Sequence, residues 1–212
     1  MKNALEYYLS KAIKKLHLRA IRGCQIHKTS KVCAGSHLVN VSMDKYSDIG
    51  YDCTIINSKI GAFCSLGANI NVGGASHTTD WVSTSPVFNE NPDHIKKKFS
   101  SHKFNLSIQT VIGNDVWIGD RSLVKAGVKV GDGAIIGMGS VVTKDIPSNS
   151  LAVGNPAKVI CALSEYINKQ KLQMKIENTF NEEYTFRNPK FNISHKDKLI
   201  KACEHYGKAF VK

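Results

Sequence analysis

The sequence has no long apolar stretch and no export signal. None of its apolar runs approaches the roughly 20 residues that a membrane-spanning helix requires. The first residues, from Met1 to Glu6, contain neither a continuous apolar segment nor a small-residue cleavage site. We therefore expect a cytoplasmic protein rather than an integral membrane protein or a secreted one.

Motifs for metal, redox and nucleic-acid binding are also missing. The six cysteines include no Cys-x-x-Cys pair, so we expect reduced thiols rather than disulfides or zinc ligands. The 29 basic and 17 acidic residues give a net charge of +12, which favours anionic partners. Because no helix-turn-helix, RNP-type or zinc motif accompanies this charge, a nucleic-acid-binding module is only a remote alternative.

What the sequence does contain is a period of six. Apolar residues make up 42% of the 212 positions, enough for a sizeable core. A branched aliphatic residue recurs every six positions at Leu106, Ile112, Ile118, Val124, Val130, Ile136 and Val142. A mostly small or β-branched residue follows four places later, at Thr110, Val116, Ser122, Val128, Ala134, Ser140 and Ile146. This period fits neither a helix nor a lone strand. It predicts a repeated strand and turn, with the aliphatic residue inside and glycines such as Gly119 easing the turns.

The same rhythm runs earlier in the chain, with more breaks. Inward aliphatic residues are expected at Ile26, Val32, Leu38, Ile49, Ile60, Leu66 and Val72. The small inward positions are then Cys24, Ser30, Ser36, Ser42, Cys53 and Cys64. Three cysteines are therefore interpreted as buried fillers of the core rather than redox groups.

The chain divides into three parts and one insertion. Residues 1–22 have a helical apolar stripe, and their other face carries Lys11, Lys14, Lys15, Arg19 and Arg22. Residues 23–161 are the all-β repeat domain, interrupted at 78–105 by a loop that is rich enough in aromatic residues to be packed and projecting. Residues 162–212 form a helical cap, with a helix over about 165–177 and a last one beginning at Ser194.

Two segments resemble the hexapeptide-repeat acyltransferases. The first is Ile112-Gly-Asn-Asp-Val-Trp-Ile-Gly119, continuing to Gly154-Asn-Pro-Ala-Lys158. The second, Ser76-His-Thr-Thr-Asp-Trp81, is similar to the branch that joins xenobiotic acetyltransferases to sugar O-acetyltransferases of surface-polysaccharide clusters. The resemblance implies a left-handed parallel β-helix with an extruded loop. It also implies a homotrimer that binds acetyl-coenzyme A between subunits, without a metal.

The resemblance also implies the site residues. His77, at the base of the loop, corresponds to the catalytic base of the family, and a neutral imidazole can take a proton from a hydroxyl. Trp117 matches a tryptophan that walls the active site, and Asp80 and Trp81 are placed to orient His77 or contact the acceptor. The positions that match coenzyme A contacts are Asp120, Gly137, Met138, Thr143, Lys144 and Lys158. No serine or cysteine motif suggests an acyl-enzyme, so direct transfer is expected.

The acceptor is expected to be a sugar hydroxyl of a surface-polysaccharide precursor made in the cytoplasm. The first alternative is a streptogramin or chloramphenicol. A metal-dependent hydratase on the same scaffold is a remote alternative that needs His77, His94 and His102 as ligands. The basic face of the N-terminal helix further suggests weak, salt-sensitive contact with anionic membranes.

Overall fold

The computed structural model divides the chain into two compact units, Met1–Leu163 and Ser164–Lys212. The structure describes residues 8, 9, 13, 17–77, 79, 81–90, 95–103, 105, 108–173, 179–180 and 210–211. Among these residues, no helix has the length and apolarity needed to cross a membrane.

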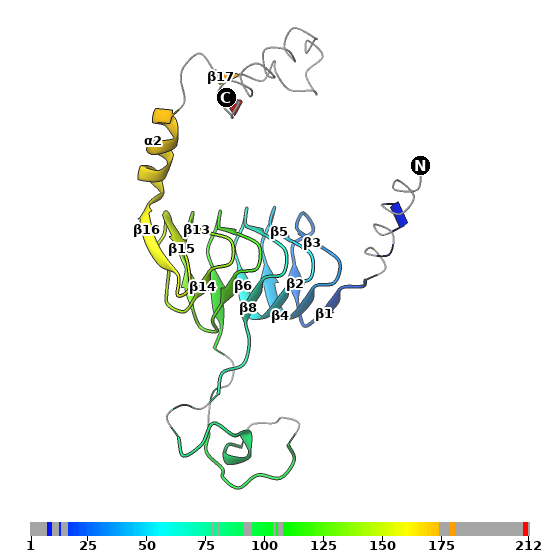
Figure 1. Cartoon of the computed structure of the whole chain (residues 1–212). Coiled ribbons are helices and arrows are strands. Elements are labelled where there is room, and N and C mark those ends of the chain that lie inside the picture. The colour runs from blue at the N-terminus through cyan, green and yellow to red at the C-terminus, as the bar shows by residue number, and fades with distance from the viewer. Residues whose placement is uncertain are drawn as a thin grey trace. The chain divides into compact units, whose positions relative to one another are not determined.

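The first unit contains a parallel β-helix of short strands (Figure 1). Each coil contributes one strand to each of three faces, and strands of successive coils pair in parallel. The first face contains β1 (Ala20–Arg22), the first half of β4 (His37–Met43), the first half of β6 (Thr54–Ile60), β8 (Asn71–Gly73), β11 (Leu123–Val124) and β14 (Val141–Val142). The second contains β2 (Gln25–Ile26), the second halves of β4 and β6, β9 (Thr110–Ile112) and β12 (Lys129–Val130). The third contains β3 (Lys31–Val32), β5 (Asp48–Ile49), β7 (Ser65–Leu66), β10 (Trp117–Ile118), β13 (Ile135–Ile136) and β15 (Ser150–Val153). The strand β16 (Lys158–Ala162) pairs antiparallel with β15. The stacked coils confirm the predicted fold and agree with its left-handed form.

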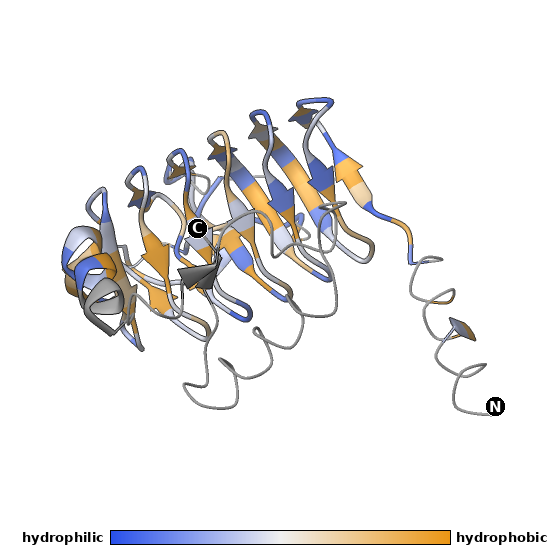
Figure 2. Ribbon diagram, turned by 90° about the horizontal axis from the view of Figure 1, so that it is seen from above, coloured by the Kyte–Doolittle hydropathy of each residue, from blue (hydrophilic) through white to orange (hydrophobic). Residues whose placement is uncertain are grey.

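The inward side chains form one continuous apolar core. From Ile112 onward, every predicted aliphatic position and every predicted small position is buried. Parallel pairing stacks these side chains in ladders, such as Leu66, Ile118 and Ile136. Each buried aliphatic side chain contributes about 1.5–3 kcal/mol. Figure 2 shows hydrophobic and hydrophilic residues alternating along the strands, with mostly hydrophilic residues at the turns. The period of six is therefore confirmed from Ile112 to Ile146, whereas Leu106 lies outside the described residues.

The prediction is wrong at Ser42, which points outward between the buried Val41 and Met43. The cause is the corner before it. In this coil two residues, Val39 and Asn40, separate the inward Leu38 from the inward Val41, and Asn40 turns the chain with a φ of 54°. Later coils use a full turn there, as in the segment 125–127. Because the early corner is shorter, the inward phase shifts by one residue.

The glycines that follow the aliphatic residues act through space rather than through a special φ. A Cβ atom on Gly119 would lie 2.6 Å from the backbone nitrogen of Met138 in the next coil. The positive φ values fall instead at the last turn position, for example 81° at Gly127. The glycines predicted to ease the turns therefore allow close stacking of successive coils.

Two of the predicted filler cysteines are fully buried, and the third is half-buried against the core. The Cys53 thiol donates to the Gly67 carbonyl oxygen at 3.1 Å, and the Cys64 thiol donates to that of Gly113 at 3.0 Å. Burial raises the pKa of both thiols above the ordinary value. Cys24 packs against the same core. These three cysteines are structural, as predicted.

The helix predicted for residues 1–22 ends too late. Ala20–Arg22 is the strand β1, and it pairs with His37–Val39 because that pairing satisfies its backbone hydrogen bonds. An Nη1 of Arg19 donates to the Val32 carbonyl oxygen at 3.3 Å. Arg19 and Arg22 therefore belong to the first coil rather than to the basic helix face. The lysines of that face, Lys11, Lys14 and Lys15, lie outside the described residues.

The predicted C-terminal helix is present as α2 (Leu163–Gln173), which has Glu165 in its first turn. The second unit also contains two short parallel strands that the sequence pattern did not indicate, β17 (Thr179–Phe180) and β18 (Phe210–Val211). The helix predicted to begin at Ser194 lies outside the described residues.

Candidate active site

The long insertion leaves the β-helix at the corner between the first and second faces (Figure 1). β8 ends at Gly73, and the next strand on the following face, β9, begins only at Thr110. The preceding coil makes the same corner with one residue, Asn57. Ser58 of that coil still pairs in register with Thr110. The insertion is therefore rooted in a rigid, fully paired frame.

His77 lies on the outgoing limb of this loop and is exposed to solvent. Its Nδ1 atom is 3.0 Å from the carbonyl oxygen of Thr84. Since a carbonyl oxygen can only accept, Nδ1 must carry a proton, and in the neutral imidazole Nε2 then keeps its lone pair. The bond also closes the segment 77–84 into a turn that contains Trp81. A neutral imidazole fixed in this tautomer is the form that accepts a proton from a hydroxyl.

The loop packs on itself, as its aromatic residues predict. Its 3₁₀ turn η1 (Pro86–Phe88) brings Phe88 against Phe99, with ring centroids 6.0 Å apart. The Phe99 amide donates to the Val87 carbonyl oxygen at 2.7 Å. The Lys98 ammonium donates to the Pro86 carbonyl oxygen at 2.8 Å. This half-buried lysine therefore holds the turn.

Trp81 is the other described site candidate on the loop. Its indole is 42% exposed and stacks on the imidazole of His102, with ring centroids 4.0 Å apart and planes 4° from parallel. Asp80, the remaining candidate, lies outside the described residues.

The third face and the corner that follows it bring together a second group of candidates. Trp117 lies on β10, 48% exposed, in register with Ile135. After that strand, Asp120 accepts the amide of Ala68 through Oδ1 at 2.8 Å, and its carbonyl oxygen accepts the Gly139 amide at 2.9 Å. Gly137 and Met138 lie at the same corner one coil further. Lys158 is the first residue of β16 and pairs with Val153 at the end of β15.

Thr143 and Lys144 lie at a different corner from this group. They follow β14. The His77 loop leaves from the same corner, in the fourth coil of the stack. In a three-faced coil this corner is opposite the third face. The root of the His77 loop, Thr143 and Lys144 therefore lie across the β-helix from the third face, which carries Trp117.

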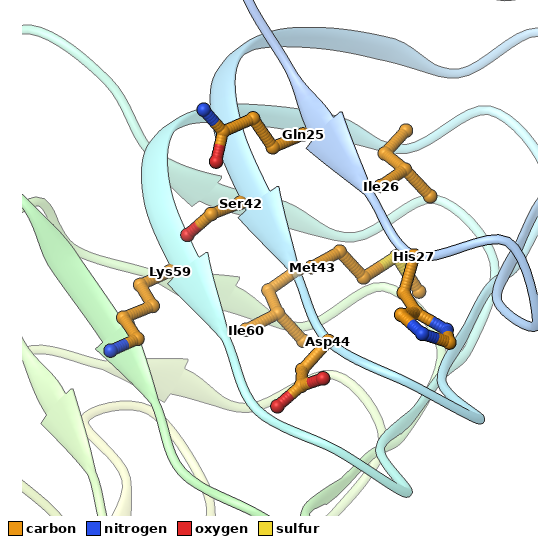
Figure 3. Close-up of a pocket in the computed structure, with 8 residues that line it drawn as sticks. All are labelled: Gln25, Ile26, His27, Ser42, Met43, Asp44, Lys59 and Ile60. Atoms are coloured by element: carbon orange, nitrogen blue, oxygen red, sulfur yellow. The ribbon is translucent and has the colours of Figure 1, made fainter.

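A separate groove lies on the second face over the first three coils and has a volume of about 420 Å³ (Figure 3). Gln25, Ser42 and Lys59 occupy register positions on neighbouring strands along it. His27 and Asp44 lie two positions further along the first two of these strands. No residue predicted for the site lines this groove.

Two partners in the loop were not identified from the sequence. Thr84 acts through its backbone carbonyl, which has no residue signature. His102 is 21 residues from Trp81, and no spacing motif connects them. Within the described part of the chain, no three His, Cys, Asp or Glu side chains are grouped to hold a metal ion. His94, which the hydratase alternative needs, lies outside it.

Part of the chain matches known proteins. Residues 109–144 match the family model described as bacterial transferase hexapeptide (six repeats). The chain is 41% identical over 104 residues to a chloramphenicol acetyltransferase from Agrobacterium fabrum, covering 48% of this chain and 49% of the relative. It is 37% identical over 101 residues to a galactoside O-acetyltransferase from Escherichia coli, covering 48% and 45%. The chain thus spans about half the length of the curated relatives it matches.

A solved structure extends the likeness to the fold. It is an N-acyltransferase from Bacillus cereus in complex with dTDP-4-amino-4,6-dideoxyglucose and coenzyme A. The TM-score is 0.57 at 17% identity, covering 78% of this chain and 97% of that one. At this identity the likeness establishes the β-helix alone.

Proposed function

We propose that this chain, whose residues 109–144 match the family model described as bacterial transferase hexapeptide (six repeats), is an acetyl-coenzyme A-dependent O-acetyltransferase. It transfers an acetyl group directly to a hydroxyl of a sugar, in a surface-polysaccharide precursor made in the cytoplasm. The galactoside O-acetyltransferase relative supports a sugar acceptor. The observation that carries the proposal is the bond between Nδ1 of His77 and the Thr84 carbonyl oxygen.

That bond gives His77 its role. The Nδ1 proton is held by the carbonyl oxygen, so Nε2 is the atom that receives the acceptor's hydroxyl proton. As the proton leaves, the acceptor oxygen attacks the thioester carbonyl carbon, and the carbon–sulfur bond breaks. The proton on Nε2 then passes to the departing sulfur, which gives free coenzyme A and a neutral His77. A positioned base of this kind contributes about 10²–10⁴-fold in rate.

The cosubstrate fits the exposed groups on both sides of the β-helix. Lys144 and Lys158 present exposed side chains, and an ammonium suits a phosphate. Gly137 adds backbone without a side chain at the Met138 corner. Trp117 adds an exposed apolar surface on the third face. We assign these residues, with Asp120 and Thr143, to acetyl-coenzyme A and to the wall of the site.

The position of these residues on opposite sides of one coil supports a homotrimer with active sites between subunits. In such an assembly the corner that carries His77, Thr143 and Lys144 faces the third face of a neighbour, where Trp117 lies. Removing either group then impairs the same site. Mixing an inactive His77→Ala chain with an inactive Trp117→Ala chain is expected to restore part of the activity.

A xenobiotic acceptor is the second candidate, because chloramphenicol acetyltransferases are among the relatives. Both candidates share the base and the cosubstrate and differ in the acceptor. Purified protein should therefore be screened for acetyl-coenzyme A consumption with sugar nucleotides, short oligosaccharides, chloramphenicol and streptogramins. Turnover of a saccharide but not of the antibiotics supports the first candidate, and the reverse supports the second.

The decisive variant is His77→Ala. We expect a folded protein with kcat lower by about 10²–10⁴-fold on whichever acceptor the wild type uses. His37→Ala is the matched control, since His37 is also exposed but lies on β4, away from the loop. Retention of most activity by the His77 variant would remove this residue from the mechanism.

A further inference from the structure

The loop that carries His77 has two limbs, which meet at a few defined contacts. The return limb, residues 95–103, bonds to the outgoing limb through the amide of Phe99 and through the His102 carbonyl oxygen, which accepts the Glu90 amide at 3.1 Å. Beyond these bonds, the His102 side chain reaches back to the turn that begins at His77 and stacks on Trp81.

The backbone of His102 is held independently of its side chain. Its carbonyl oxygen accepts the Glu90 amide, and its amide donates to the Ser100 hydroxyl at 3.2 Å. Removal of the imidazole therefore leaves the bonds that join the limbs. The stack is not needed to close the loop, so its effect falls on the other partner, Trp81.

Trp81 gains a fixed orientation from the stack. The two ring planes are 4° from parallel at 4.0 Å, so the imidazole covers one face of the indole. The indole is still 42% exposed. It lies within the turn that the bond between His77 and Thr84 closes. An exposed aromatic surface in the same turn as the base is suited to pack against the C–H face of a sugar ring, which is apolar although the ring carries hydroxyls.

We propose that His102 is a positioning residue that holds the Trp81 indole flat beside the His77 turn, so that its open side receives the acceptor ring. This role rests on the proposed acetyl transfer. It assigns His102 to acceptor binding and neither to proton transfer nor to acetyl-coenzyme A binding. The contact between the two rings is present whether or not the proposed reaction is correct.

The stack is tested by fluorescence. The chain has two tryptophans, so a Trp117→Phe background reports Trp81 alone. In that background, His102→Ala is expected to shift the emission to longer wavelength and to raise quenching by acrylamide about two- to fourfold. His102→Phe restores a flat ring and should return both values toward those of the background protein. His37→Ala is the control and should change neither. Unchanged quenching in His102→Ala would overturn the stack and the proposal with it.

The positioning role is tested by kinetics in the otherwise wild-type chain, on the acceptor that gives turnover in the screen. His102→Ala should raise KM for the acceptor about three- to tenfold, with kcat and KM for acetyl-coenzyme A within twofold. His102→Phe should recover most of the loss. Loss of the stack with an unchanged acceptor KM would mean that the pair is structural only. A wild type without turnover on every acceptor contradicts the proposed function, and with it the acceptor role of Trp81, whereas the fluorescence result still decides the stack.

Discussion

Replacement of Ile118 by aspartate tests the inward phase of the coils most severely. Ile118 has no solvent exposure and stacks between Leu66 and Ile136 in the third-face ladder. Loss of the aliphatic side chain alone costs about 2–5 kcal/mol. The nearby buried hydroxyl of Ser122 already donates to carbonyl oxygens, at 2.8 Å to that of Gly119. A new carboxyl therefore has no ready partner.

The charge adds a second cost, which depends on pH. An unperturbed aspartate has a pKa of about 3.9, so protonation at pH 7 costs about 4 kcal/mol. A protonated carboxyl without a partner costs about 1–3 kcal/mol more. The three contributions sum to about 7–12 kcal/mol, which is comparable to the whole stability of a domain, about 5–15 kcal/mol. Because burial raises the pKa in the folded state, the protonation cost is absent below pH 4 and grows as the pH rises.

Urea unfolding followed by circular dichroism, at pH 7 and at pH 4.5, measures these contributions. Ile118→Asp should be unfolded or barely folded at pH 7. Ile118→Asn lacks the protonation cost and should be more stable than the aspartate variant at pH 7 by about 4 kcal/mol, with the gap closing at the lower pH. Asn71→Asp places the same carboxylate on the outward side of β8 and should unfold like the wild type. Cooperative unfolding of Ile118→Asp at pH 7 with wild-type stability would show that the inward phase is misassigned.

Two further predictions concern residues between the coils. Asp120→Ala should lose about 0.5–1.5 kcal/mol of stability in urea unfolding, because the Ala68 amide loses its acceptor. Asp120→Asn keeps an amide oxygen at that place and should lose less. A fall in coenzyme A affinity with unchanged stability would instead make Asp120 a ligand contact only. Above the ordinary thiol pKa of 9.0 the unfolded chain loses protons that the buried Cys53 and Cys64 thiols retain, so stability should fall as the pH rises from 8 to 10. Cys64→Ser should show a smaller fall. An equal fall in the wild type and in this variant would exclude the Cys64 thiol as a cause.

The fold could be predicted where burial alone determines the residue type. Ile118 and Val124 are apolar because their side chains point into the coil, and that requirement recurs with every turn. Ser42 was misplaced because two residues, Val39 and the left-handed Asn40, separate the inward Leu38 from Val41, where the later coils have three. Asparagine tolerates this conformation better than most residues. Asn40 and Asn57 both take this conformation at the short corner of the early coils.

The site could be predicted only as far as motifs extend. The position of His77 followed from the segment around it. Its hydrogen-bond partner did not, since any residue at position 84 has a carbonyl oxygen. The stack of His102 on Trp81 depends on how the two limbs of the loop meet, and the spacing of residues in the sequence does not indicate this. Trp117 lies on the third face, and the loop of His77 leaves from the corner opposite that face. This placement could not be predicted without the number of residues in each coil.

The short corner at Asn57 and the long loop at the same corner one coil later show how much variation in connection length the stack tolerates. Thr110 resumes the ladder in register with Ser58, so the coils on either side are indifferent to the length of what lies between Gly73 and Thr110. The entropic cost of bringing the two ends of a loop together grows only slowly with the length of the loop. The stack can therefore accept a loop of another length beyond His77 while the pairing of its strands stays the same.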